Sequence, residues 1–171
     1  MTCAECGSDR VTVERNAAIR YDMGGLHHIT LQGVEMQRCA SCGDEGIKIP
    51  RIGQLHRVLA DYLIRQPRLL MGNEIRFLRT HLGLSTQDFS HRMGVTRETV
   101  SRWENARERM GEPTDHLLRA LVTSYQPTES YAVDDLLRDL PDTLSLPKEE
   151  KAVNVSVQNT TTGWKAETVG V

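Results

Sequence analysis

Two short amphipathic segments joined by a glycine occupy residues 84–105, which read LSTQDFSHRMGVTRETVSRWEN. Ser85 can cap the first segment, and Asp88, three residues later, completes a capping-box-like pair. Gly94 permits a left-handed turn between the two segments, and Thr96 can cap the second. These signals predict two short helices separated by a tight turn.

The side chains of the second segment divide into two faces. Val100 and Trp103, three residues apart, share the face that must be buried, and Phe89 and Met93 supply a matching apolar face on the first segment. The outward face carries Arg97, Glu98, Thr99, Ser101 and Arg102. Arginine can pair with guanine, while serine and threonine can bind phosphates or bases. A merely solvated helical bundle is the alternative, but the glycine turn and the arginine-rich face favour DNA binding.

Helical periodicity extends to both sides of this stretch. Apolar residues spaced from Ile52 to Leu63 predict a helix that ends near Pro67, and further helices are expected over residues 74–82 and 114–125. Residues 51–111 carry eleven arginines against six acids, whereas both flanks are acidic. A basic block between acidic flanks indicates a local surface for a polyanion.

Two near-identical cysteine pairs mark the N-terminal segment, where residues 3–7 read CAECG and residues 39–43 read CASCG. The two-residue spacing lets one turn direct both sulfurs at one ion, and the glycine allows the positive φ of that turn. The four thiolates predict one structural Zn²⁺ held by Cys3, Cys6, Cys39 and Cys42. Iron in the same site and a thiol-redox role are the alternatives. At most one of His27 and His28 could join the ligands, because adjacent strand residues point to opposite faces.

Short alternating runs predict a small sheet between the cysteine pairs, with turns at Gly24-Gly25 and at Gly33. Near the C-terminus, the alternating valines 153, 155 and 157 and then Trp164 favour a hairpin, with disorder as an equal alternative. A short amphipathic piece is expected over Val133–Leu140.

Composition excludes several classes of protein. The 171 residues are 39% hydrophobic and 26% charged, which is ordinary for a globular chain. No apolar run approaches the roughly 18 residues of a membrane span, and the first residues lack the features of a signal peptide. We therefore expect a cytoplasmic protein with no membrane partner, whose cysteines bind metal rather than form disulfides. Paired carboxylates, a glycine-rich phosphate loop and a nucleophile–base spacing are all missing, so we expect no enzyme.

Residues 84–105 resemble the Xre (lambda-repressor-like) helix-turn-helix family, whose second half typically reads Gly-Val-Ser-x-x-x-Ile-Ser-x-Trp-Glu. Together with the cysteine pairs, residues 1–125 resemble the MqsA-type antitoxins, in which a YgiT-type zinc finger precedes this helix-turn-helix. The resemblance implies a zinc-stapled N-terminal domain that can clasp a toxin, and a homodimeric domain that binds palindromic operator DNA.

Carried over by position, the resemblance places Glu98 and Arg102 where that family reads bases, with Arg97 and Thr99 beside them. Departures from the family leave the operator sequence open: Thr86 stands where many members have a glutamine, with Gln87 shifted by one, and Ala106 replaces a glycine. Glu98 also replaces a neutral reader. The complete set of expected DNA-binding residues is Thr86, Gln87, Thr96, Arg97, Glu98, Thr99, Ser101 and Arg102.

The sequence thus predicts an α+β multidomain chain. A small β-rich zinc-ribbon-like domain (residues 1–50) and a connecting helix (51–71) precede an all-α lambda-repressor-like helix-turn-helix domain (72–125), and an acidic tail follows (126–171). The expected function is a DNA-binding transcriptional regulator that represses its own operon and acts as the antitoxin to a toxin partner. The alternatives are a regulator without a toxin and a thiolate–metal redox protein.

Overall fold

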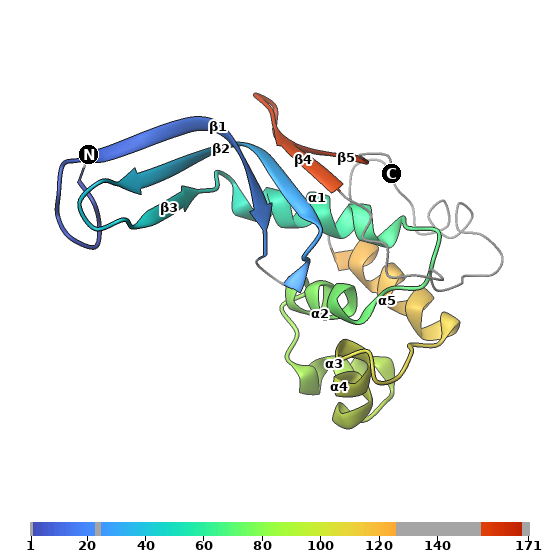
Figure 1. The fold of residues 1–171 in the computed structure, drawn as a ribbon. Coiled ribbons are helices and arrows are strands. Elements are labelled where there is room, and N and C mark those ends of the chain that lie inside the picture. The colour runs from blue at the N-terminus through green and yellow to red at the C-terminus, as the bar shows by residue number, and fades with distance from the viewer. Residues whose placement is uncertain (1, 23–24, 126–154, 169–171) are drawn as a thin grey trace. The chain divides into compact units, whose positions relative to one another are not determined.

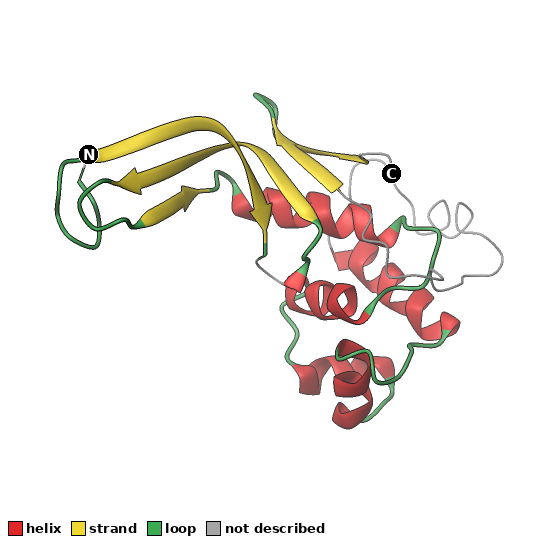
Figure 2. Ribbon diagram, in the orientation of Figure 1, coloured by secondary structure: helices red, strands yellow, loops and turns green. Residues whose placement is uncertain are grey.

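The computed structural model describes residues 2–22, 25–125 and 155–168, and divides into two compact units. The sheet unit comprises the described parts of residues 1–21, 27–55 and 153–171, and the helical unit comprises those of residues 22–26 and 56–152. Figure 1 and Figure 2 show strands in the first and helices in the second. The predicted α+β class, a β-rich N-terminal region followed by an all-α domain, is confirmed. The piece expected over Val133–Leu140 lies outside the described residues.

The sheet is built around one central strand, β2 (Ile29–Cys39). Strand β1 (Val11–Tyr21) pairs with one side of β2 in antiparallel fashion. The other side is shared: β3 (Glu45–Lys48) pairs antiparallel with the second half of β2, and β4 (Val155–Asn159) pairs parallel with its first half. Strand β5 (Trp164–Thr168) completes a hairpin with β4. The C-terminal segment therefore belongs to the same sheet as the N-terminal strands.

The turn predicted at Gly33 is wrong, because β2 continues through this residue. Gly33 has a φ of 74°, and a Cβ there would lie 3.2 Å from the backbone oxygen of Asn159. The side-chain amide of Asn159 also donates to the carbonyl of Gly33 at 3.3 Å. The glycine thus marks a close approach of the end of β4. His27 and His28, expected on a strand, lie in the turn that precedes β2.

Side chains anchor the C-terminal hairpin to the sheet unit. Val155, Val157 and Trp164 are buried, and the indole N–H of Trp164 donates to the carbonyl of Pro50 at 2.9 Å. Arg51 donates to the side-chain oxygen of Asn159 at 2.8 Å. Of the two alternatives for this part of the tail, the structure forms the hairpin.

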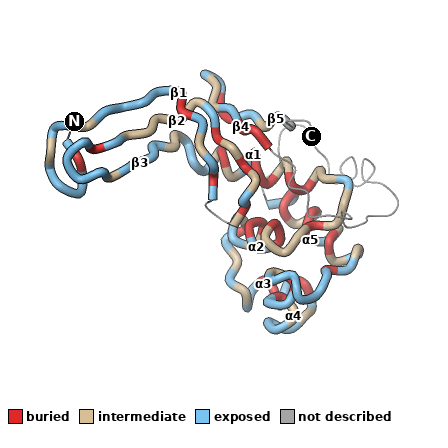
Figure 3. The backbone as a smooth tube through the Cα atoms, in the orientation of Figure 1, coloured by how far each residue is buried: buried red, intermediate tan, exposed pale blue. Residues whose placement is uncertain are grey.

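Five helices lie in the described part of the helical region, and their apolar faces supply the core of the helical unit, as the burial colours of Figure 3 show. The side chains of Leu78, Phe89, Val100 and Leu118 are fully enclosed. None of the helices in the described part of the chain combines the length and the apolar character that a bilayer span requires. The helices are α1 (Ile52–Ile64), α2 (Gly72–His81), α3 (Thr86–Met93), α4 (Arg97–Glu104) and α5 (Glu112–Tyr125).

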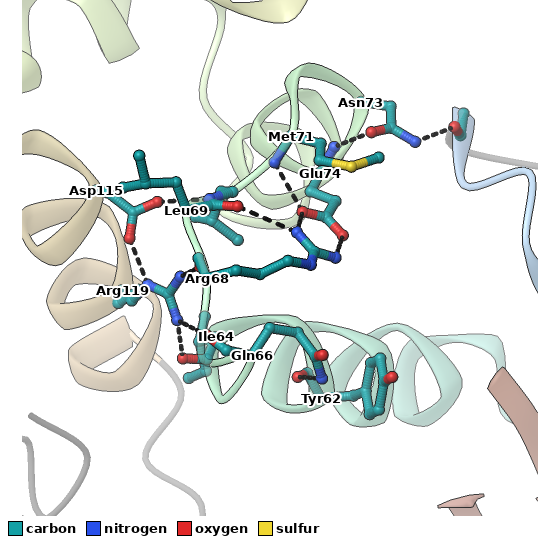
Figure 4. Close-up of polar contacts among 12 residues, drawn as sticks. Tyr62, Ile64, Gln66, Arg68, Leu69, Met71, Asn73, Glu74, Asp115 and Arg119 are labelled. Carbon is teal, nitrogen blue, oxygen red and sulfur yellow. Dashed lines mark hydrogen bonds and ion pairs between the residues drawn. The ribbon is translucent and has the colours of Figure 1, made fainter. Parts of the chain in front are cut away.

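A buried ion pair on α5 fixes the segment between α1 and α2. Arg119 and Asp115 are both fully buried, and the Arg119 Nε donates to the Asp115 Oδ1 at 2.5 Å. The remaining guanidinium nitrogens donate to the carbonyls of residues 64, 66 and 68, and Asp115 accepts from the backbone N–H of Leu70 (Figure 4). Each guanidinium nitrogen and both carboxylate oxygens of the pair thereby have a partner, as a buried charge requires.

A second ion pair caps the start of α2. Arg68 donates both terminal nitrogens to the carboxylate of Glu74, at 2.8 and 2.6 Å, and Glu74 also accepts from the backbone N–H of Met71 (Figure 4). The periodicity of the sequence gave no sign of either pair, because charged residues on a helix are ordinarily solvated.

Candidate nucleic-acid interface and metal centre

Local hydrogen bonds fix where the two short helices of the motif begin, as the sequence predicts. The Ser85 hydroxyl accepts from the backbone N–H of Asp88 at 3.1 Å and donates to its carboxylate at 2.6 Å. This hydroxyl lowers the pKa of Asp88. Gly94 ends α3 with a φ of 66°, and Thr96 caps α4 by accepting from the backbone N–H of Thr99. The predicted caps and left-handed turn are confirmed.

The last two residues of α4, Trp103 and Glu104, both hold the helix against the rest of the helical unit. Trp103 is buried in the core, whereas the carboxylate of Glu104 accepts from Arg79 Nε at 2.6 Å and from Arg76 Nε at 3.3 Å. Arg79 also donates to the carbonyl of Leu84. The ion pairs of Glu104 and the hydrogen bond of Arg79 therefore fix α2, α4 and the start of the motif against one another.

A groove of about 630 Å³ runs along the outward face of α4. Five of the eight residues expected to bind DNA line it: Thr86, Arg97, Glu98, Ser101 and Arg102. The other three lie outside its lining, since Thr96 caps α4, Thr99 contacts Thr96 and Arg102, and Gln87 contacts His91.

Two groove arginines lie outside the set that the sequence predicts. Arg76 comes from α2, where it also donates to the side chain of Asn105 at 3.1 Å, and Arg107 follows α4. Only the arginine-rich composition of residues 51–111 could have pointed to them. With Arg97 and Arg102 they place four guanidinium groups on one groove, against the two carboxylates of Glu98 and Glu104, and Glu104 is paired with Arg76 and Arg79. The groove therefore favours a polyanion.

The two central side chains of α4 have defined partners. Arg102 forms an ion pair with Glu108 at 3.2 Å and donates to Thr99 at 3.3 Å. The pKa of Glu98 is lowered by hydrogen bonds from its own backbone N–H and from Thr96, and further by the nearby Arg97 and Arg102. Glu98 is thus an ionised carboxylate at the N-terminal turn of the helix, where the helix dipole favours negative charge.

Comparison with known proteins bears on this segment. A family model described as helix-turn-helix matches residues 75–126. These residues are thus similar to helix-turn-helix domains of the Xre type. The match covers less than half of the chain and marks a DNA-binding regulator family. Searches of curated proteins and of solved structures found no match.

The four cysteines converge at the end of the sheet unit. The Sγ atoms of Cys3 and Cys42 lie 3.7 Å apart, those of Cys6 and Cys39 lie 3.6 Å apart, and all four lie within 4.8 Å of one another. A tetrahedral ion with bonds to sulfur of about 2.3 Å requires sulfur atoms about 3.8 Å apart. All four cysteines are free, and a disulfide needs about 2.05 Å. The cluster therefore has the dimensions of a metal site.

Two equivalent turns direct the thiols inward. The backbone N–H groups of Gly7 and Gly43 donate to the carbonyls of Cys3 and Cys39, and both glycines have a positive φ, 70° and 77°. A hydrogen bond of 2.6 Å between the hydroxyls of Ser8 and Ser41 joins the turns. The glycine that follows each cysteine pair thus has the conformation that the sequence predicts.

The electrostatics of the cluster also suit a cation. Backbone hydrogen bonds from Cys42 and Ser41 lower the pKa of Cys39 to about 6. A backbone hydrogen bond from Asp44 lowers the pKa of Cys42, but its hydrogen bonds with the other thiols and its desolvation outweigh this effect and raise the pKa to about 12. One thiolate therefore forms readily while a neighbour resists ionisation, and a bound cation would relieve this repulsion.

Proposed function

We propose that this chain is a transcriptional repressor that binds operator DNA as a homodimer, with α4 of each protomer in the major groove. The observation that carries the proposal is the groove on α4, where four arginines and the small polar side chains of Thr86 and Ser101 lie together. Arg102 is the base-reading residue, Ser101 and Arg97 contact bases or phosphates, and Arg76 and Arg107 bind the flanking phosphates. Two-fold symmetry places the half-sites about one helical turn apart.

Arg102→Ala tests this assignment on duplex DNA from upstream of the protein's own gene. We expect a loss of about 1–3 kcal/mol in binding free energy, measured by fluorescence anisotropy, while the fold is kept. The matched control is Arg15→Ala on β1, which removes the same charge from a side chain that is 81% exposed and outside the groove. Equal affinities for the two variants would contradict the role given to Arg102.

We further propose that the cysteine cluster holds one structural Zn²⁺, bound by Cys3, Cys6, Cys39 and Cys42. Four thiolates in a closed tetrahedron leave no open position for a substrate, which supports a structural and non-enzymatic role. The bound ion would neutralise the thiolates and join the two turns. Metal analysis with an absorption spectrum tests the proposal, because an iron–tetrathiolate site is coloured and a zinc site is colourless.

We propose, last, that the protein is the antitoxin of a toxin–antitoxin pair. Support comes from the order of its parts, a four-cysteine unit followed by an Xre-type helix-turn-helix, which resembles the MqsA-type antitoxins. Expression of the complete operon with a tag on this chain should bring down a small partner protein encoded next to it. Purification of this chain alone from its native operon would instead favour a regulator without a toxin.

A further inference from the structure

A second cavity in the helical unit, separate from the groove, has a volume of about 200 Å³. Its walls come from the segment that precedes α2, from α2 itself, from the end of α4 and from the loop that follows α4. The buried side chains of Leu70, Ile75, Trp103 and Met110 supply the apolar part of the lining, and polar atoms line much of the rest. A dry cavity of roughly 150 Å³ can hold benzene, so this one has room for a ring with a short arm.

Two charged side chains line this cavity, and they differ in whether they have an ion-pair partner. Glu108 is paired with Arg102 at 3.2 Å. Arg109 is exposed and makes no hydrogen bond or ion pair with any residue in the described ranges. The unmatched charge at the cavity is therefore positive, and a ligand with an apolar body and an anionic end would complement it.

We propose that this cavity binds a small carboxylic acid with an aromatic or branched apolar body, whose carboxylate pairs with Arg109. The apolar part would lie among the buried side chains, with Trp103 as its largest contact. Neither the helix-turn-helix motif nor the cysteine cluster uses these side chains to contact DNA or metal.

The position of the cavity links it to the groove, and this consequence rests on the proposed DNA-binding function. Between residues 101 and 110 the chain lines both: Ser101, Arg102, Glu104, Asn105 and Arg107 face the groove, whereas Trp103, Ala106 and residues 108–110 face the cavity. A carboxylate on Arg109 adds negative charge two residues from Arg107, and therefore weakens DNA binding. The ligand acts as an inducer that lowers operator affinity by about fivefold or more.

The direct test is an NMR titration of the full-length, metal-loaded protein with 3-phenylpropionate, which has about eleven non-hydrogen atoms. We expect saturable binding at millimolar or lower concentration. The backbone signals of Ile75, Ala106 and Met110 should shift. The cationic analogue phenethylamine should bind more weakly than the acid. Absence of saturable shifts at these residues, or equal binding of the two analogues, would overturn the proposal.

Two arginines in the same loop provide matched variants. Arg109→Gln should weaken binding of 3-phenylpropionate by about threefold to fivefold, as expected for an exposed ion pair. Arg107→Gln, which lines the groove and not the cavity, should leave probe affinity unchanged and weaken DNA binding. The same effect of both variants on the probe would show that the acid binds to general positive charge.

The outcomes also separate this inference from the proposed function. Specific DNA binding that is insensitive to saturating 3-phenylpropionate would overturn the inducer role and leave the repressor intact. Probe binding that depends on Arg109, in a protein that binds no duplex, would overturn the repressor and leave the acid-binding cavity.

Discussion

At the scale of single residues, Gly72 is the described glycine of the helical unit at which a side chain would meet the closest backbone contact. A Cβ at this first residue of α2 would lie 2.5 Å from the backbone oxygen of Trp103 and 2.9 Å from that of Glu104. Both oxygens belong to the backbone at the end of α4, so neither can rotate away. The contact holds α2 against the helix whose outward face forms the groove.

We predict that Gly72→Ala destabilises the protein by about 1–3 kcal/mol, as expected for overpacking. Intrinsic helix propensity alone predicts the opposite sign, because alanine is favoured over glycine by about 1 kcal/mol. Urea unfolding followed by circular dichroism measures the difference. Gly53→Ala, near the start of α1, is the control, because no atom lies within 4 Å of its Cβ position. Similar stability changes for the two variants would contradict the close approach.

Among the elements, α1 and α2 share an aromatic cluster that makes the helical unit sensitive to pH. The rings of His56 and Phe77 meet edge to face at 5.8 Å, and those of Phe77 and His81 stack at 6.2 Å. Burial lowers the pKa of both histidines, and the positive charges of His56 and Arg57 lower that of His81 further. The folded cluster therefore favours neutral imidazoles.

We predict that the helical unit loses stability as the pH falls below about 6.5, the ordinary histidine value. Because the folded pKa values are lowered, the unfolded chain binds more protons in this range, so the contribution is complete at higher pH and is lost on acidification. Thermal melts from pH 8 to pH 5.5 measure it. The double variant His56→Gln with His81→Gln should show a weaker dependence, and an unchanged pH profile would contradict the assignment.

The C-terminal hairpin is the second element with a testable role. Trp164→Ala on β5 removes a buried indole and its hydrogen bond to Pro50, and should destabilise the sheet unit by about 3–5 kcal/mol. Exposed Lys165 is the control, and Lys165→Ala should change stability little. Chemical unfolding in the presence of metal separates the two variants. If Trp164→Ala destabilised the protein no more than Lys165→Ala does, the hairpin would not support the sheet.

What the sequence predicts at this scale depends on whether the signal is local. The helices of the motif are predicted well because Ser85, Gly94 and Thr96 act within one turn of their own positions. The groove residues on α4 share one helix face and follow from the same periodicity. Arg76 and Arg107 were missed because they enter the groove from outside α4.

Features that depend on residues far apart in the sequence could not be predicted from local patterns. The parallel pairing of β4 with β2 joins opposite ends of the chain, and alternation of apolar residues does not specify a partner strand. The sequence suggested a turn at Gly33. A glycine is needed there because Asn159, on that distant strand, approaches closely. The buried pair Asp115 and Arg119 was hidden because a helix pattern assigns charged residues to the solvent face.

For the whole molecule, the two units should respond differently to loss of metal. A small sheet domain with few large apolar side chains depends on its metal, because the binding free energy is also folding free energy. We predict that a strong chelator unfolds the sheet unit and leaves the helical unit folded. Far-UV circular dichroism and NMR of the methyl groups of Leu78 and Leu118 follow the units separately. Joint unfolding of both units, or of neither, would contradict this division.

Binding to duplex DNA across a range of salt concentrations shows whether the groove on α4 is a DNA-binding surface. We predict that the full-length protein binds the DNA upstream of its own gene more tightly than a scrambled duplex. Because Arg76 and Arg107 of each protomer are assigned to phosphates, the homodimer neutralises at least four of them, and the logarithm of affinity should fall with the logarithm of salt with a slope of about −4 or steeper. Absence of binding to any duplex at low ionic strength would contradict a DNA-binding function.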